Sequence, residues 1–86
     1  MTQRLYNIDG NEIEFTATSN LKNTEEGWLD QLQDGYIKRN GEKIPCQLGY
    51  AYRGGASTEP TVLFIKKGIT AKGNHYESET IEVDRA

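Results

Sequence analysis

Alternation of apolar and polar residues along most of the chain predicts β-strands joined by tight turns. The dipeptide Asp9-Gly10 is typical of a two-residue type I′ hairpin loop, because both central positions of that loop need a positive φ. Counting outward from it gives the pairs Ile8 with Asn11, Tyr6 with Ile13 and Arg4 with Phe15. In this register four apolar side chains share one face of the hairpin: Tyr6, Ile8, Ile13 and Phe15.

Residues 24–34 carry the pattern of a short helix. Asn23 or Thr24 can cap its first turn, and Gly35 stands where a left-handed residue often ends a helix. At 100° per residue, Trp28 and its apolar neighbours fall on one side of such a helix. We therefore expect Trp28 to anchor a helix on one face of the sheet.

A second hairpin is predicted at Asn40-Gly41, which pairs Arg39 with Glu42 as a cross-strand ion pair and Ile37 with Ile44. The strand that follows alternates cleanly, with one face made of Ile44, Cys46, Leu48, Tyr50 and Tyr52. Because Pro45 has no N–H for a ladder, the strand should be bulged there or lie at an edge.

The run Val62-Leu63-Phe64-Ile65 predicts a central strand with both faces covered, since all four residues are apolar. Residues 75–83 read as a last strand whose charged face is typical of a protected sheet edge. The expected fold class is therefore α+β. It consists of an antiparallel sheet of about five to six strands with one short helix, 24–34, on one face.

Length and composition indicate a single small globular domain, residues 1–86. With only one cysteine, Cys46, the chain cannot close an internal disulfide, which favours a reducing compartment such as the cytoplasm. The sequence also contains no apolar stretch of signal-peptide or membrane-spanning length, so we expect a soluble protein without membrane contact.

Formal charges are sorted along the chain in three blocks. Residues 1–35 have a net charge of −5, residues 36–72 of +5 and residues 73–86 of −3. The two signs could either pair inside the fold or form separate surface patches. Separate patches would favour a protein that recognises a charged partner.

Three carboxylates, Glu26, Asp30 and Asp34, lie at spacings of four residues and would form one stripe on the predicted helix. A solvated face that keeps the protein soluble would have the same pattern. As a functional surface, the stripe would bind a protein partner. Our first hypothesis is therefore a small non-enzymatic interaction module that docks on a macromolecule and modulates or inhibits it. Because one short helix cannot cover the whole sheet, a homodimer is also consistent with the sequence.

The basic middle segment offers a second hypothesis, which is binding of RNA, single-stranded DNA or a small anion. Lysines and arginines alternate there with tyrosines, as in platforms that contact phosphates and stack bases. The candidate anion-binding residues are Lys38, Lys43, Arg53 and Lys66. Tyr50 and Tyr52 share a face with apolar residues, which equally fits a structural role in the core.

The sequence offers few residues suited to catalysis, and it predicts no catalytic residue, metal site or cofactor. A Cys46 and His75 dyad would need two distant strands to meet. His75, Glu77 and Glu79 share a strand face but equally fit an exposed polar edge. The third hypothesis, a ribonuclease-like hydrolase, would use Glu59, Arg53 and His75 as base, phosphate clamp and acid.

Overall fold

The structure is a computed structural model that describes residues 2–24, 29–52 and 58–85. These residues form strands and turns and contain no helix. The strands are β1 (Thr2–Asn7), β2 (Glu12–Ala17), β3 (Lys22–Asn23), β4 (Gln31–Arg39), β5 (Glu42–Tyr52), β6 (Thr58–Ile65), β7 (Gly68–Ile69), β8 (His75–Tyr76) and β9 (Glu79–Arg85).

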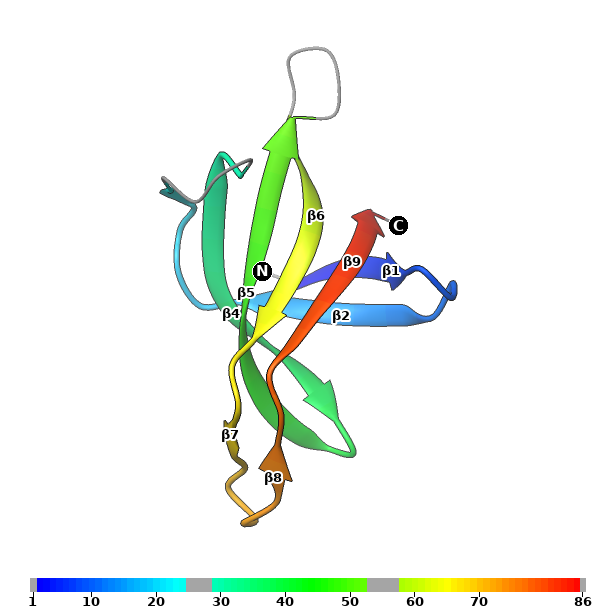
Figure 1. Cartoon of the computed structure of the whole chain (residues 1–86), viewed down its shortest axis with the longest axis vertical. Helices are drawn as coiled ribbons and strands as arrows, with labels where there is room; N and C mark the ends of the chain where they lie inside the picture. Colours follow the sequence, from blue (N-terminus) through cyan, green and yellow to red (C-terminus); the bar gives the residue numbers. More distant parts are fainter. Residues whose placement is uncertain (1, 25–28, 53–57, 86) are drawn as a thin grey trace.

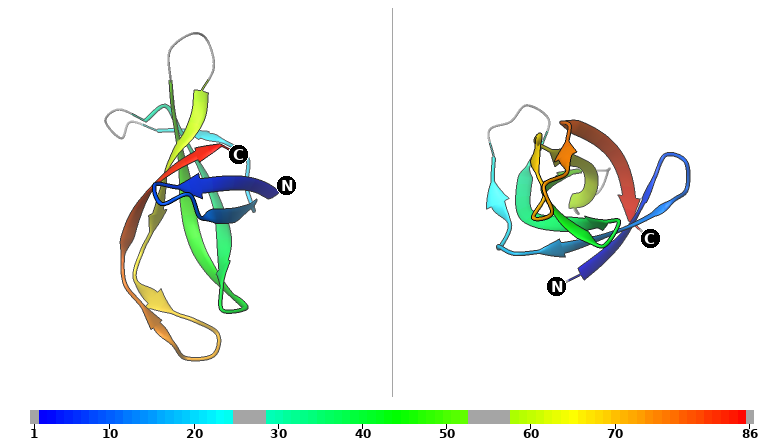
Figure 2. Two further views of the ribbon diagram at one scale, coloured as in Figure 1. Left: turned by 90° about the vertical axis from the view of Figure 1, so that its right-hand side faces the viewer. Right: turned by 90° about the horizontal axis from the view of Figure 1, so that it is seen from below.

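Six of the strands close into an antiparallel barrel in the order β1, β2, β4, β5, β6, β9 and back to β1. Each strand pairs with its neighbours in this sequence, so the barrel is an up-and-down meander (Figure 1). The view along the longest axis shows the strands curling round a common centre (Figure 2, right). Closure gives most strands two partners and so removes much of the exposed edge that an open sheet would present.

The barrel interior holds the main hydrophobic core. Its largest fully buried side chains come from four strands, with Leu5 on β1, Phe15 on β2, Leu48 on β5 and Leu63 on β6. The other buried members are Ile37, Ile44, Cys46, Tyr50, Ile65 and Val83. Alternation along each strand points these residues inward, as expected for a small barrel filled by side chains.

Polar groups close both ends of this core. At one end the Gln3 amide donates to the Tyr50 hydroxyl (2.6 Å), and that hydroxyl donates to the buried Gln33 side chain (2.9 Å). At the other end Arg39 forms a bidentate ion pair with Glu79. Each polar side chain thus finds a partner where the interior meets water.

A second, smaller core covers the outer face of β5 and β6. Leu29 packs there against Ala51 and Val62, with Leu32 and Phe64 at its margin. Leu29, just before β4, therefore covers the outer face of the sheet where the sequence predicted a helix. Together the two cores bury both faces of β6, which confirms the prediction from its four apolar residues.

The α+β prediction is wrong, because the region 24–34 contributes strand β4 from Gln31 onward and no helix among its described residues. Trp28 lies outside the described residues. The inward positions of β4 include Gln33 and Gly35, whose polarity and small size hide the alternation that marks a strand. Gly35 is a strand residue instead of a helix cap.

Gly35 permits a close approach of β2 and β4. The Phe15 ring packs directly on it from β2, and a Cβ at position 35 would lie 2.5 Å from Phe15 Cζ and overlap the Thr16 carbonyl oxygen. Only a residue without a side chain lets β2 and β4 approach in this way. The β2–β4 ladder that closes the barrel therefore depends on Gly35.

The predicted register of the first hairpin is wrong by one residue. Leu5 pairs with Ile13 and Gln3 with Phe15, so Leu5 instead of Tyr6 enters the core. The loop has three residues and ends at Gly10, which has a φ of 82°. The Asn7 side chain fixes this loop by accepting hydrogen bonds from the Asp9 and Asn11 amides.

The second hairpin is confirmed, with Asn40 and Gly41 both at positive φ and Ile37 paired with Ile44. The predicted ion pair between Arg39 and Glu42 is wrong, because Arg39 binds Glu79. Ile44, Cys46, Leu48 and Tyr50 all point into the core as expected. Pro45 precedes the β5–β6 ladder, which begins at Gln47, so its missing N–H faces an unpaired edge.

The last strand is also corrected. β9 pairs with β6 along Glu79–Glu82 and with β1 along Val83–Arg85, so it lies within the barrel, although its 79–82 segment has no partner strand on the β1 side among the described residues. Residues 66–74 contain β7 and the turn of a small hairpin, β7–β8. This hairpin extends the β6 and β9 pair along the long axis of the molecule (Figure 1).

Replacing Gly35 by alanine should destabilise the protein by about 3 kcal/mol, because the new methyl group meets backbone and a packed ring. Gly41→Ala is the matched control. Its Cβ would meet open space, so only the positive φ costs free energy, about 1 kcal/mol. Urea denaturation followed by circular dichroism measures both values, and equal losses would contradict the close contact.

Candidate interaction site

Most basic residues of the middle block are not neutralised by acids from the two ends. Among the described residues, the ion pairs are Arg4 with Glu12, Lys22 with Asp34, and Arg39 with Glu79. Of these, the Arg39 pair joins the middle block to an end block. The charge sorting seen in the sequence therefore persists at the surface.

Of the predicted partner-binding acids, Glu26 lies outside the described residues. Asp30 stands in the bend before β4, and Asp34 lies within β4, so they do not form a helical stripe. The Oδ2 atom of Asp30 is buried and has no hydrogen-bond partner among the described residues. Whether these carboxylates contact a partner stays a prediction.

The Asp34 carboxylate is held by neighbours within the fold. The Gln47 amide and the Lys22 ammonium group each donate to it at 2.9 Å. These hydrogen bonds lower the pKa of Asp34 below its ordinary value. Asp34 therefore links β3, β4 and β5 through its two side-chain partners.

The predicted anion-binding residues are spread over the surface. Lys38 and Lys43 face each other across the β4–β5 hairpin, as the sequence predicts, and Lys43 Nζ lies 4.7 Å from the centre of the Tyr36 ring. Lys38 shares a surface hollow with Glu12 and Glu14, so its charge faces acids. Lys66 lies past the end of β6, and Arg53 lies outside the described residues.

The enzyme hypotheses gain no geometric support. Cys46 is buried in the core, whereas His75 is exposed on β8, so they do not share a cleft. Glu59 is near the start of β6, and β8 lies at the other end of the long axis (Figure 1). Within the described residues, no group of histidine, cysteine and carboxylate side chains could hold a metal ion.

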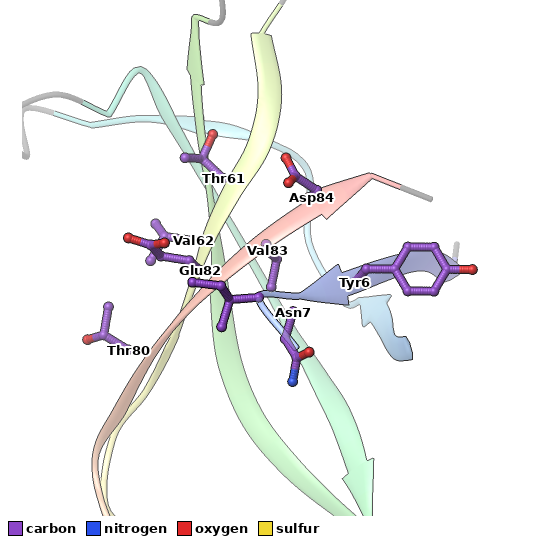
Figure 3. Close-up of a pocket in the computed structure, with 9 residues that line it drawn as sticks. Tyr6, Asn7, Thr61, Val62, Thr80, Glu82, Val83 and Asp84 are labelled. Atoms are coloured by element: carbon purple, nitrogen blue, oxygen red, sulfur yellow. The ribbon is translucent and has the colours of Figure 1, made fainter. Parts of the chain in front are cut away.

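A groove of about 370 Å³ lies on the outer surface where β1, β6 and β9 meet (Figure 3). We call it the β1–β9 groove. It is lined by Tyr6, Asn7, Ile8, Thr61, Val62, Thr80, Glu82, Val83 and Asp84. Among the described residues, the lining combines aliphatic and aromatic surface with two carboxylates and includes no lysine or arginine.

The groove exists because the β1–β2 hairpin leaves the barrel. The β1–β9 ladder runs from Leu5 to Asn7, and beyond Asn7 the chain turns away into the hairpin loop. Figure 1 shows this hairpin projecting sideways from the barrel. The outer surface of β9 and the underside of the hairpin form the two walls of the corner.

The groove exposes apolar surface that has no role in the core. Ile8 at the hairpin tip is 82% exposed and Tyr6 is 38% exposed. The sequence interpretation placed both in the core, because it assumed a two-residue loop. The polar triplet Asn7, Asp9 and Asn11 around the loop is the signal that could have indicated the longer turn.

No protein-family model, no curated protein and no solved structure matches the chain. The residues that the structure describes include no helix long and apolar enough to cross a lipid bilayer. A function for this fold must therefore be inferred from the chemistry of the site itself.

Burial in the barrel raises the pKa of the Cys46 thiol to about 12, three units above its ordinary value. At pH 8 the folded protein should therefore react with a thiol reagent such as 5,5′-dithiobis(2-nitrobenzoate) about a thousandfold more slowly than the protein unfolded in guanidinium chloride. Absorbance of the released thiolate measures both rates. Similar rates would contradict the buried position of Cys46.

Glu42 and Asp34 should make the free energy of unfolding depend on pH in the acid range. Hydrogen bonds from the Thr70 side chain, the Asn74 amide and the Lys72 backbone lower the pKa of Glu42, as those from Gln47 and Lys22 lower that of Asp34. The two carboxylates therefore stabilise the folded state fully above their ordinary pKa values, 4.5 for Glu42 and 3.8 for Asp34. This stabilisation is lost as the pH falls below those values.

Urea denaturation between pH 7 and pH 3 tests this expectation. The double variant Asp34→Asn and Glu42→Gln should lose less stability on acidification than the parent protein, because two titrating groups are gone. Glu14→Gln, a change at an exposed position of β2, serves as the control. A parent and double variant with the same pH dependence would exclude these two groups as the source.

Proposed function

We propose that the protein is a non-enzymatic interaction module whose β1–β9 groove binds a protein segment that carries both apolar and basic side chains. Binding would let it modulate or inhibit the partner. The observation that carries this proposal is the composition of the groove, in which exposed Tyr6 and Ile8 lie beside Glu82 and Asp84. Exposed apolar surface with a polar rim is typical of interaction sites.

The charge of the groove favours a protein over a nucleic acid. Glu82 and Asp84 would repel phosphates, and the chain as a whole has a net charge of −3. A lysine or arginine beside an aliphatic side chain would complement both parts of the lining. Electrostatic attraction would then guide the encounter, and apolar contact with Ile8 and Tyr6 would hold the complex.

A free strand edge supports binding of an extended segment. β9 pairs with β6 through Glu79–Glu82, but its ladder with β1 covers only Val83–Arg85. On the β1 side, residues 79–82 therefore face no strand of the described chain. Alternate backbone groups along this edge are available for strand addition, a common mode of peptide recognition.

Titration of the ¹⁵N-labelled protein with synthetic peptides tests the proposal. An extended peptide of alternating lysine and isoleucine should shift the amide signals of β1, β9 and Val62. Glu82→Lys should weaken its binding about tenfold, because an attraction becomes a repulsion. Glu14→Lys, the same change on β2 outside the groove, should have little effect.

Two further probes separate the alternatives. A peptide of glutamate and isoleucine should not bind, and a peptide of lysine and serine should bind more weakly than the parent peptide. A fluorescent oligonucleotide should show no salt-sensitive binding. Tight oligonucleotide binding that Lys43→Glu abolishes would overturn the proposal in favour of the nucleic-acid hypothesis.

A cytoplasmic location belongs to the same proposal. It is supported by the single cysteine, which is buried as a free thiol and takes no part in a disulfide.

A further inference from the structure

The β7–β8 hairpin and the residues before it carry basic side chains, which are absent from the described lining of the β1–β9 groove. The Ile69 side chain of this hairpin is 61% exposed and therefore adds little apolar contact to the core. The segment 66–76 also holds three lysines and no acid. Lys66 and Lys67 make no ion pair with any residue that the structure describes.

The hairpin is fixed in place before any partner binds. Its turn is closed by hydrogen bonds from the Thr70 amide to the Asn74 carbonyl (2.8 Å) and from the Gly73 amide to the Thr70 carbonyl (2.9 Å). The Glu42 carboxylate on β5 also accepts hydrogen bonds from the Lys72 backbone and the Asn74 side chain. Such preorganisation lowers the entropic cost of binding.

The hairpin cannot reach the groove of its own chain. Val62 lines the groove, and Ile69 follows seven residues later along a nearly extended path, at a distance of roughly 20 Å. The hairpin continues away from the groove along the long axis (Figure 1). The Glu42 anchor holds it in that direction, so only another molecule can bring an equivalent hairpin to the groove.

We infer that the β7–β8 hairpin of one copy binds in the β1–β9 groove of a second copy, with Ile69 against Ile8 and Tyr6 and the lysines beside Glu82 and Asp84. This inference rests on the proposed function, because it names a second copy of the chain as one partner of the groove. The two surfaces differ, so the contact is head-to-tail, and a pair of copies still has one free groove on one copy and one free hairpin on the other.

The assembly should be weak and should respond to salt. A groove of this size buries less surface than a stable dimer needs, so association should rise with protein concentration. The attraction between lysines and carboxylates is screened by ions, so added sodium chloride should shift the protein toward monomer.

Sedimentation velocity over a hundredfold range of concentration tests the inference. The parent protein should show an average mass that increases with concentration. Ile69→Glu removes the hairpin surface and Ile8→Lys removes the groove surface, and each variant alone should remain a monomer. Both positions are exposed, so the barrel should fold normally, which circular dichroism checks.

Mixing the two variants gives the decisive result. Ile69→Glu keeps a working groove and Ile8→Lys keeps a working hairpin, so an equimolar mixture should form a dimer that grows no further. Leu21→Glu, at an exposed apolar residue in the connection between β2 and β3, should assemble like the parent protein. A mixture that stays monomeric, or a Leu21→Glu variant that also fails to assemble, would overturn the inference.

The two proposals fail in different ways. A parent protein that stays monomeric at every concentration but binds the lysine and isoleucine peptide in the groove would exclude self-assembly and leave the proposed function standing. If the parent protein does not bind the peptide and its assembly is unchanged by Ile8→Lys, the groove is excluded as the binding site in both proposals.

Discussion

Closure of the barrel depends on the contact between the Phe15 ring and the backbone at Gly35. The β2–β4 ladder is short, with register pairs from Phe15 to Ile37 through Ala17 to Gly35, yet it turns an open meander into a ring. The ring then encloses one continuous core whose polar ends are completed by Tyr50 with Gln33 and by Arg39 with Glu79. Without close approach at this point, the inner face of every strand would meet water.

The same geometry produces the β1–β9 groove, which we propose as the binding surface. Because β1 pairs with β9 only through its last three residues, the hairpin beyond Asn7 stands clear of the barrel and leaves a corner against β9. The interior is filled by side chains, so a surface open to other molecules must lie on the outside of the barrel. An acidic corner and a basic hairpin therefore follow from one charge pattern, since the middle block supplies β7 and the end blocks supply β1 and β9.

Sequence patterns predicted the elements whose local chemistry is unambiguous. Asn40 and Gly41 fixed a hairpin register because few residue pairs adopt two positive φ angles, and the apolar run in β6 required cover on both faces. The pattern failed at Gln33 and Gly35, where strand positions are dictated by distant partners on β5 and β2. It failed again at Asn7, whose side chain lengthens the loop and moves Tyr6 and Ile8 from core to groove.

Strand β1 both closes the barrel and lines the groove, so binding of any occupant in the groove would be coupled to the folding equilibrium. Leu5 and Tyr6 are neighbours on β1, with the first inside the barrel and the second in the groove. An occupant that contacts Tyr6 and β9 together would have no intact site on a chain whose β1 had detached. By mass action it would favour the closed ring, so a rise in melting temperature reports ligand capture without any label.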